Sequence, residues 1–309
     1  MSYNDVLVNR FHNENEYGGD LKQVNKQTPI VSVIIATYQQ KNYIAQCIEG
    51  VLMQQTNFII EIIIGEDHST DGTREICIKY AEKYPDKIRL FLRDRSQSQY
   101  YENDVFISRF NGIWSRMSAR GKYVAFCEGD DYWIDPFKLQ KQVSFLEENK
   151  DYSMCFHNAF VENLYSLGKV SSFPIKSCTN TFTTKELFRN KWFIPTASIV
   201  CKTKYLPHNI EELKYLNLEG DMLIQLAQSK YGKIYCLREF MSVYRFGTPS
   251  SLTKQNSKNP LKPLRKFILL LDKINTNFFD DKYSNEVNYR RVKYYLSVIK
   301  YYLLRLFRV

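Results

Sequence analysis

The sequence lacks the features of membrane-spanning, secreted and nucleic-acid-binding proteins. No apolar run is long enough to span a bilayer, and residues 1–26 are polar, without the apolar core of a signal peptide. The seven cysteines are odd in number and widely spaced within apolar runs, which is typical of buried thiols rather than of a disulfide framework. Zinc-knuckle spacing, RNA-binding signatures and internal repeats are also missing. We therefore expect a protein of the reducing cytoplasm with no nucleic-acid partner.

The composition is that of a soluble globular protein rich in aromatic residues. Of the 309 residues, 44% are hydrophobic, 15% aromatic and 25% charged, which excludes disorder over most of the length. The formal net charge is +10, with basic segments concentrated towards the C-terminus at residues 262–266 and 290–293. Such a charge implies an anionic partner, and phospholipid, nucleotide phosphate and nucleic acid would all satisfy it.

Apolar runs and helical periodicity alternate along the first half of the chain. Strands are predicted at residues 30–36, 59–65, 88–92 and 123–127, and helices at 43–55, 70–84 and somewhere within 103–120. A further helix is predicted at residues 136–149, with Asp135 as its N-cap. Strands that alternate with helices predict an α/β fold with a mainly parallel central sheet flanked by helices.

The alternation is weaker after residue 150. Strands are predicted at residues 154–161 and 197–202, helices at 184–190 and 221–231, and no clear element at 234–244. We divide the chain into a flexible leader (1–28), a main domain (29–246), a linker (247–263) and C-terminal basic amphipathic helices (264–309).

The last predicted helix has an apolar stripe next to basic residues. Two interpretations are open, packing against the main domain or shallow insertion at an anionic membrane surface. The stripe recurs at helical spacing and consists of Val292, Tyr295, Leu296, Ile299, Leu303 and Leu306.

Two predicted strands each end in a cluster of carboxylates. Glu66 and Asp67 follow the second strand, and Glu128, Asp130 and Asp131 follow the strand at 123–127. Crowded carboxylates repel one another unless a cation lies between them, so a divalent metal with bound phosphates is the natural partner. A single cluster is equally consistent with a solvated acidic turn, but two clusters at the ends of parallel strands predict one shared site.

Three ordered motifs resemble the family 2 glycosyltransferases, which have the GT-A fold. They are residues 31–38, residues 66–73 and Glu128-Gly129-Asp130-Asp131, and the resemblance extends over about residues 29–246. It implies a Rossmann-like central sheet and an enzyme that moves a sugar from a nucleotide diphosphate donor, usually with inversion at the anomeric carbon.

The resemblance also implies roles for individual residues. Asp130 is the expected ligand of Mg²⁺ or Mn²⁺, with Glu128 and Asp131 as supporting candidates. Family members usually have Asp where this chain has Glu128, whose longer side chain can reach the cation through water. The remaining donor-binding candidates are Asp67, which matches the carboxylate that commonly binds the donor base, and Thr37, Tyr38 and Glu66.

An inverting transfer needs a base for the acceptor hydroxyl. Glu219-Gly220-Asp221 resembles the later acidic motif of the family, which implies Asp221 as the base with Glu219 as the fallback. N-capping of a helix is the alternative role of Asp221. Arg245 is either a diphosphate ligand or a structural arginine, and it is followed by Phe246 where many relatives have histidine. Three other residues are candidates either for contact with a sugar or acceptor or for the hydrophobic core, namely Tyr132, Trp133 and His157.

The function predicted first is a cytoplasmic glycosyltransferase at the inner face of the membrane. It would build a cell-surface polysaccharide, lipopolysaccharide or glycolipid from a nucleotide sugar and a saccharide or lipid-linked acceptor. A nucleotidyltransferase is the second hypothesis, although residues 37–40 lack the glycine-rich phosphate loop of that class. The third is a carbohydrate-binding relative without catalytic activity.

Overall fold

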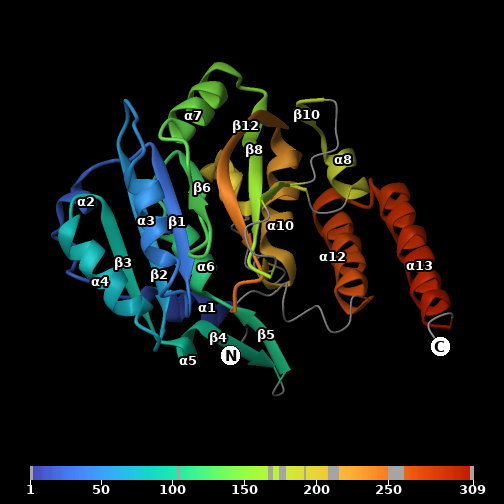
Figure 1. The fold of residues 1–309 in the computed structure, drawn as a ribbon, viewed down its shortest axis with the longest axis horizontal. Coiled ribbons are helices and arrows are strands. Elements are labelled where there is room, and N and C mark those ends of the chain that lie inside the picture. Colours follow the sequence, from blue (N-terminus) through green and yellow to red (C-terminus); the bar gives the residue numbers. More distant parts are fainter. Residues whose placement is uncertain are drawn as a thin grey trace.

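The computed structural model describes residues 3–102, 105–165, 170–173, 179–190, 193–207, 216–249 and 261–306 (Figure 1). A ten-stranded sheet runs through the molecule in the order β10-β12-β8-β11-β6-β1-β2-β3, and β7 and β9 pair with β12 and β8. Helices cover both faces of this sheet. The architecture confirms the predicted α/β fold with a central sheet between helices.

The first half of the sheet is parallel. It consists of β1 (Val31–Thr37), β2 (Ile60–Asp67), β3 (Ile88–Arg93) and β6 (Tyr123–Phe126). Most of their residues are apolar and many are β-branched, as expected for strands that are buried on both faces. Because these strands run in the same direction, their C-terminal ends and the polar residues that follow lie along one edge of the sheet.

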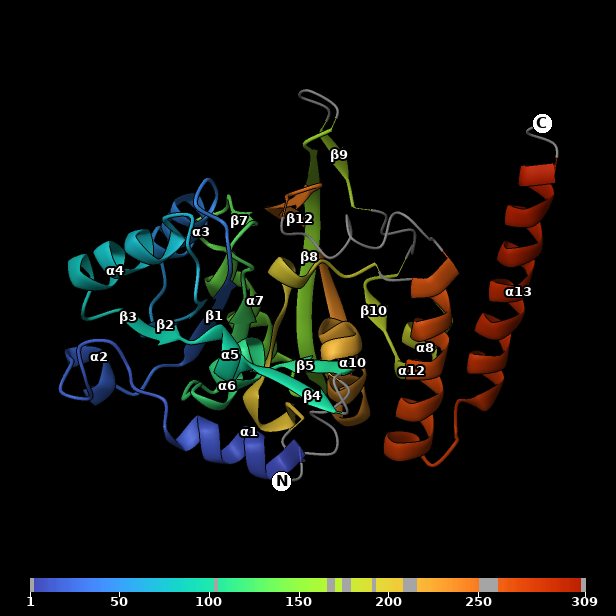
Figure 2. The same cartoon turned by 90° about the horizontal axis from the view of Figure 1, so that it is seen from below.

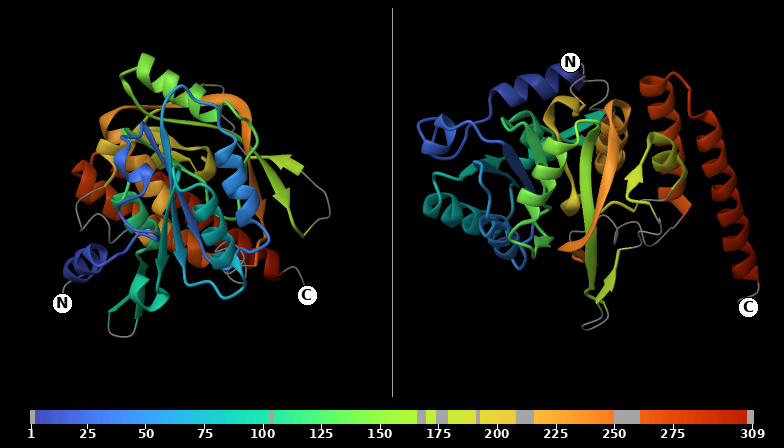
Figure 3. Two further views of the ribbon diagram at one scale, coloured as in Figure 1. Left: turned by 90° about the vertical axis from the view of Figure 1, so that its left-hand side faces the viewer. Right: turned by 90° about the horizontal axis from the view of Figure 1, so that it is seen from above.

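The second half of the sheet is mixed. The long strands β8 (Tyr152–Asn163) and β12 (Lys233–Phe246) pair in parallel, and β11 (Val200–Lys202) lies antiparallel between β8 and β6. The sequence predicts no clear element for 234–244, because Arg238 and Glu239 interrupt the apolar pattern. The structure has a strand there, and these two residues lie where β12 leaves its regular register with β8. Three short strands add antiparallel pairs, namely β7 (Tyr132–Trp133), β9 (Val170–Ser172) and β10 (Thr181–Phe182). The hairpin of β8 and β9 projects beyond the sheet (Figure 2, Figure 3).

Alternating residues of the central strands face two separate hydrophobic cores. In β1, Val33 and Ile35 face the core under α3 (Ile44–Leu52), α4 (Thr73–Lys83) and α7 (Lys138–Glu148). Ile34 faces the other core, beneath α6 (Asn111–Met117) and α10 (Leu216–Tyr231). Because successive side chains of a strand point to opposite faces, one sheet packs against a layer of helices on each side.

The connection from β3 to α6 contains more than the single helix that the sequence predicts. A short helix, α5 (Arg95–Ser98), leads into a two-stranded antiparallel ribbon of β4 (Gln99–Glu102) and β5 (Val105–Arg109). The helix predicted within 103–120 is α6, which follows this ribbon. The ribbon lies outside the main sheet.

The N-terminal segment is packed on the domain, in contrast to the predicted flexible leader. It forms α1 (Tyr3–His12) and α2 (Gln23–Lys26). Leu7 is fully buried, and Trp114 on α6 donates a hydrogen bond from Nε1 to the Leu7 carbonyl at 3.2 Å. Glu14 forms an ion pair with Arg93 at the end of β3. Two buried apolar residues at helical spacing, Tyr3 and Leu7, were too weak a pattern to predict α1.

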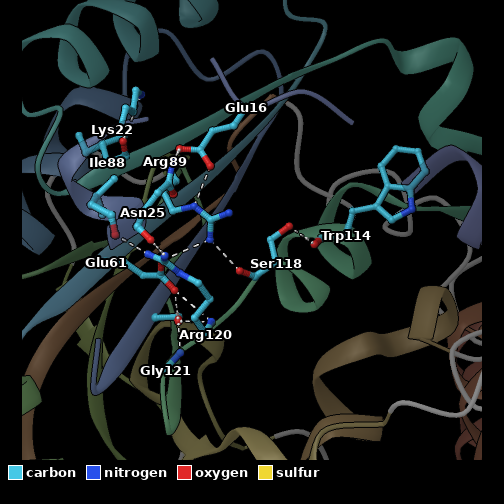
Figure 4. Close-up of polar contacts among 12 residues, drawn as sticks. Glu16, Lys22, Asn25, Glu61, Ile88, Arg89, Trp114, Ser118, Arg120 and Gly121 are labelled. Carbon is cyan, nitrogen blue, oxygen red and sulfur yellow. Dashed lines mark hydrogen bonds and ion pairs between the residues drawn. The ribbon is translucent and has the colours of Figure 1, made fainter. Parts of the chain in front are cut away.

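Buried ion pairs connect the leader to the sheet (Figure 4). Glu61 on β2 is fully buried and lies 2.6 Å from Arg120 and 3.3 Å from Arg89. Arg89 also contacts Glu16 at 2.8 Å, and Arg120 donates to the carbonyls of Val24 and Asn25. This network lies at the start of the strands, and it fixes residues 16–25 against β2 and β3.

The C-terminal region forms two long antiparallel helices, α12 (Leu261–Phe279) and α13 (Ser284–Leu306). α12 packs on α10, and α13 packs on α12 and on α8 (Thr184–Arg189). α13 therefore lies on the outer side of the molecule, with α12 between it and the sheet (Figure 1, Figure 2). Among the described residues, none of the helices has the length and apolar character needed to span a bilayer.

Candidate active site

The turns that follow β1 and β2 are bound to each other at the C-terminal edge of the sheet. The backbone N–H of Gln39 donates to Ser69 Oγ at 2.9 Å, and that of Gln40 donates to Thr73 Oγ1 at 2.8 Å. Gln39 and His68 have left-handed backbones, with φ of 54° and 64°. Such φ values cost energy for residues other than glycine, and they are found where surrounding contacts enforce a particular loop shape.

The acidic loop after β6 lies directly against the end of β1. The N–H of Gly129 donates to the Ala36 carbonyl at 3.2 Å, and Thr37 Oγ1 donates to Gln40 Oε1 at 2.8 Å. A Cβ atom at Gly129 would lie 2.8 Å from Thr37 Oγ1 and closer still to Gln40 Oε1. Glycine at this position thus permits the close approach that brings the carboxylates of the loop next to Thr37.

Asp130 is held by a residue that no sequence motif indicates. Thr248 is fully buried, and its Oγ1 donates to Asp130 Oδ2 at 2.7 Å. Burial raises the pKa of Asp130, whereas the hydrogen bond from Thr248 and the charge of Arg245 act in the opposite direction. The predicted linker thus supplies a contact to the predicted metal ligand.

Asp131 supports the loop from inside the protein. It is 1% exposed, and its Oδ1 accepts a hydrogen bond from the Arg245 N–H at 2.9 Å. Its Oδ2 has no hydrogen-bond partner among the described residues. Burial raises the pKa of Asp131 well above its ordinary value, and the nearby Asp130 and Glu128 raise it further.

Glu128 brings the acidic loop together with Asp221. The Glu128 side chain is exposed to solvent. Partial desolvation raises its pKa, and the charges of Asp130 and Asp221 raise it further. The structure thus places the predicted base within electrostatic range of the predicted metal site.

The donor set of the loop fits a cation that is shared with a phosphate ligand. Among the described residues, no three or more His, Cys, Asp or Glu side chains are arranged to enclose a metal ion. Mg²⁺ is often bound by one or two carboxylates, with substrate phosphates and water completing its coordination. Asp130 and Glu128, next to the unpartnered oxygen of Asp131, provide that kind of donor set.

Asp221 lies inside α10 rather than at its N-terminus. The helix begins at Leu216, so the alternative role of Asp221 as an N-cap is wrong. Glu219 lies on the same helix, but its side chain is outside the described part of the structure. Asp221 is partly exposed, as a residue that meets an acceptor must be.

The second predicted donor-binding group lies at the end of β2. Asp67 is 2% exposed and accepts hydrogen bonds from Arg95, at 2.6 Å, and from Ser98. The Arg95 guanidinium lies 3.4 Å from the centroid of the Tyr38 ring. Burial raises the pKa of Asp67, whereas Ser98 and Arg95 lower it. Arg95 follows β3 at the same edge of the sheet, and the rule that selected Asp67 could have selected it too.

Glu66 has a different environment from Asp67. It is fully buried, forms an ion pair with Arg74 on α4, and accepts a hydrogen bond from the Ser69 N–H at 2.7 Å. Both carboxylate oxygens therefore stabilise the turn between β2 and α4. This geometry assigns Glu66 to the support of the site.

Arg245 has the structural role that the sequence left open. It is 6% exposed, and its guanidinium donates to the Asp130 carbonyl at 2.8 Å, to Glu162 at 3.1 Å and to Gln46. The guanidinium also lies 4.3 Å from the ring centroid of Tyr132. Its nitrogens are thus engaged in holding the acidic loop, and the structure does not direct them at a diphosphate.

His157 and Trp133 lie in the core. His157 is fully buried, and its Nδ1 is 2.8 Å from the Asn158 carbonyl oxygen. Burial, together with the charge of Lys138, lowers its pKa well below the ordinary value. Trp133 is 2% exposed and donates from Nε1 to the Ala197 carbonyl at 2.8 Å. Neither ring is placed to contact an acceptor.

Comparison with known proteins identifies the family. The profile described as Glycosyl transferase family 2 matches residues 32–208, more than half of the chain. The chain belongs to glycosyl transferase family 2. All three motifs from which the resemblance was inferred lie within or at the border of the matched range, so the comparison confirms the predicted family.

Individual relatives match different shares of the chain. An uncharacterized protein of Mycobacterium bovis is 34% identical over 220 residues, which are 70% of this chain and 58% of that protein. The chain thus spans less than two thirds of that relative. The putative teichuronic acid biosynthesis glycosyltransferase TuaG of Bacillus subtilis is 35% identical over 120 residues, 39% of this chain and 43% of TuaG.

A solved structure confirms the GT-A fold of the family. The crystal structure of S. aureus TarS 1-349 in complex with UDP-GlcNAc matches with a TM-score of 0.55 at 16% identity. The match covers 83% of this chain and 69% of the TarS chain. At this identity the likeness concerns the fold.

Proposed function

We propose that this protein transfers a sugar from a nucleotide diphosphate sugar to a hydroxyl group of a saccharide or lipid-linked saccharide. The observation that carries the proposal is the arrangement at the edge of the sheet. Asp67 ends one parallel strand, Glu128 and Asp130 follow another, and Asp221 lies within electrostatic range of Glu128. Ligands of open α/β sheets bind at this edge. The complex of the structurally similar TarS with UDP-GlcNAc supports a nucleotide-sugar donor.

In this proposal, Asp130 and Glu128 are the residues that would hold Mg²⁺ or Mn²⁺ when the donor is bound. The cation supplies positive charge where negative charge develops on the leaving nucleoside diphosphate. Thr248 and Arg245 keep the acidic loop in place through the contacts to the carboxylate and carbonyl of Asp130. The donor base lies beside Asp67 at the end of β2, and one of the two Asp67 oxygens exchanges its present bond from Arg95 or Ser98 for a hydrogen bond from the base.

Asp221 acts as the base in the proposed transfer. The acceptor oxygen forms a bond to the anomeric carbon on the face opposite the diphosphate, and the bond from that carbon to the diphosphate oxygen breaks. The hydroxyl proton passes to the Asp221 carboxylate, and the nucleoside diphosphate leaves with the electron pair. Attack from the opposite face inverts the configuration at the anomeric carbon.

We propose cell-surface polysaccharide synthesis as the setting and the inner face of the membrane as the location. The similarity to TuaG, whose name places it in teichuronic acid biosynthesis, supports this setting. The basic C-terminal helices support a position beside anionic lipid.

The donor site is tested by thermal shift with uridine, guanosine, cytidine and thymidine diphosphate sugars, with and without Mn²⁺. We expect one donor class to stabilise the wild-type protein in a Mn²⁺-dependent manner, and Asp130→Asn to abolish this stabilisation. Asp86→Asn, at an exposed position just before β3 and thus at the opposite edge of the sheet, is the matched control and should behave as wild type. A folded wild-type protein that responds to no donor contradicts the proposal.

The reaction is tested by product analysis with the donor found in this way. Release of nucleoside diphosphate supports sugar transfer, whereas release of pyrophosphate supports a nucleotidyltransferase. We expect Asp221→Asn to bind the donor like the wild-type protein and to lose at least about a hundredfold in transfer rate. Unchanged transfer by this variant rules out Asp221 as the base.

A further inference from the structure

The outward side of α13 is an exposed apolar surface, which we call the α13 strip. Its central residues, Val292, Leu296, Ile299 and Leu303, are between 47% and 60% exposed. At 100° per residue these positions fall within a narrow sector of the helix. The sequence left packing on the domain as one interpretation of this stripe, and the structure places these four residues in solvent instead.

The opposite side of α13 makes the contacts that hold the helix in place. Val287 is buried in the core, and Arg290 lies 5.0 Å from the ring centroid of Phe267 on α12. Arg291 pairs with Asp272 of α12 at 2.7 Å. The α13 strip therefore lies on the side of the helix away from these contacts, and its residues stay exposed in the folded chain.

The borders of the α13 strip carry groups suited to an interface between apolar and polar surroundings. Tyr295 and Tyr302 lie along one border and are 57% and 56% exposed. Lys293 and Lys300 lie along the other border, and both are exposed. Tyrosine rings are favoured at the boundary of a bilayer, and lysine can keep its stem in apolar surroundings while its ammonium group reaches anionic headgroups.

The charge of the helix distinguishes a membrane from a second copy of the chain as the occupant of the strip. Between Ser284 and Leu306 the sequence has five Lys and Arg and one acidic residue, Glu286, which lies in the first turn. Two copies that met through this strip would bring basic borders together without acidic partners. An anionic lipid surface supplies the missing negative charge.

We propose that the α13 strip lies in the headgroup region of an anionic phospholipid bilayer and attaches the enzyme to it. The attachment itself is independent of catalysis, but its benefit rests on the proposed function, because a lipid-linked acceptor would be presented at the same surface. The helix lies in the plane of the interface with its apolar residues inserted and its lysines at the phosphates.

Vesicle sedimentation of the full chain tests the proposal. We expect the wild-type protein to sediment with vesicles that contain phosphatidylglycerol, to bind less to phosphatidylcholine alone, and to be released by added salt. Leu296→Gln with Ile299→Gln should weaken binding at least about tenfold. The matched control is Leu21→Gln with Ile59→Gln, which removes equivalent side chains that are 86% and 46% exposed elsewhere, and should bind as wild type.

A second pair of variants examines the basic border. Lys293→Ser with Lys300→Ser should reduce the preference for anionic vesicles. The control, Lys79→Ser with Lys83→Ser on α4, removes the same charge elsewhere and should leave that preference unchanged. Circular dichroism and the donor-induced thermal shift confirm that each variant is folded. Equal vesicle binding by the strip variants and the wild-type protein overturns the proposal.

The oligomeric state of the protein in solution tests whether a second copy of the chain covers the strip. If the wild-type protein is a dimer that Leu296→Gln with Ile299→Gln converts to a monomer, and if it ignores vesicles, the strip binds a second copy and the proposal is overturned. Vesicle binding is measured without donor. Vesicle binding without sugar transfer therefore supports the membrane-binding strip and contradicts the enzyme function. Sugar transfer to a soluble acceptor without vesicle binding supports the enzyme function and overturns the membrane proposal.

Discussion

At the scale of single residues, the hydrogen bond from Thr248 to Asp130 gives the most direct prediction about the site. Thr248→Val removes the hydroxyl group that holds the carboxylate. We expect the Mn²⁺ concentration needed for the donor-induced thermal shift to rise about 10- to 100-fold, because groups that orient metal ligands commonly contribute that much. Thr248→Ser keeps the hydroxyl group and should stay close to wild type. Equal Mn²⁺ dependence of the valine and serine variants would contradict this role.

Lys138 gives a prediction about stability and pH. Its side chain is fully buried, its ammonium nitrogen lies 3.9 Å from the centroid of the Trp133 ring, and burial lowers its pKa from 10.5 to about 7. Below pH 7 the amine is charged in both states, so the folded protein bears the full cost of burying the charge. Between pH 7 and 10.5 the unfolded chain binds more protons, so the free energy of unfolding rises with pH.

We therefore expect Lys138→Met to stabilise the protein at about pH 6 by roughly 2–4 kcal/mol and to have a smaller effect at about pH 9. Urea unfolding at the two pH values measures this difference. A variant that is destabilised equally at both would show that the amine contributes through packing alone.

At the scale of helices and strands, the N-terminal helix α1 is part of the folded domain. Leu7 is fully buried, and Leu7→Ala should lower the free energy of unfolding by roughly 2–5 kcal/mol through the cavity that it leaves. Leu21 belongs to the same segment but is 86% exposed, so Leu21→Ala is the matched control and should have little effect. Equal, small effects in denaturant unfolding would favour the flexible leader that the sequence predicts.

The elements that the sequence predicts well are those whose residues are buried on both faces. β1, β2, β3 and β6 are short apolar runs, and their boundaries agree with the predicted strands within about two residues. Elements that depend on distant partners were predicted less well. β12 has one solvent-facing stretch and an irregular register with β8, and the start of α10 lies five residues before the predicted Asp221.

The candidate site follows the same division. Asp67, Glu128 and Asp130 were predicted because they directly follow buried strands at a common edge of a parallel sheet. The partner of Asp130, Thr248, lies in a segment of small polar residues with no local pattern, and only the folded chain brings it to the carboxylate. Arg245 had two possible roles in the sequence, and its contacts became apparent only when Glu162 and Gln46 were placed beside it.

At the scale of the whole molecule, one hydrophobic core joins the two ends of the chain. It contains Leu7 from α1, Trp114 from α6, Leu271 from α12 and Val287 from α13. We therefore expect calorimetry to show one unfolding transition, with equal calorimetric and van't Hoff enthalpies. A separate transition at lower temperature that involves the C-terminal helices would instead support the predicted division at residues 247–263.

Arg245 has a consequence for the order in which the protein becomes competent during synthesis. It binds Gln46, 199 positions earlier in the chain, and the carbonyl of Asp130. Contacts between such distant positions form only after the intervening chain has been made and folded. A chain still on the ribosome with residues up to 240 exposed already carries the acidic loop, but without the arginine and threonine that fix it. The acidic loop is therefore held in its final position only late in translation, once Arg245 and Thr248 have both been made.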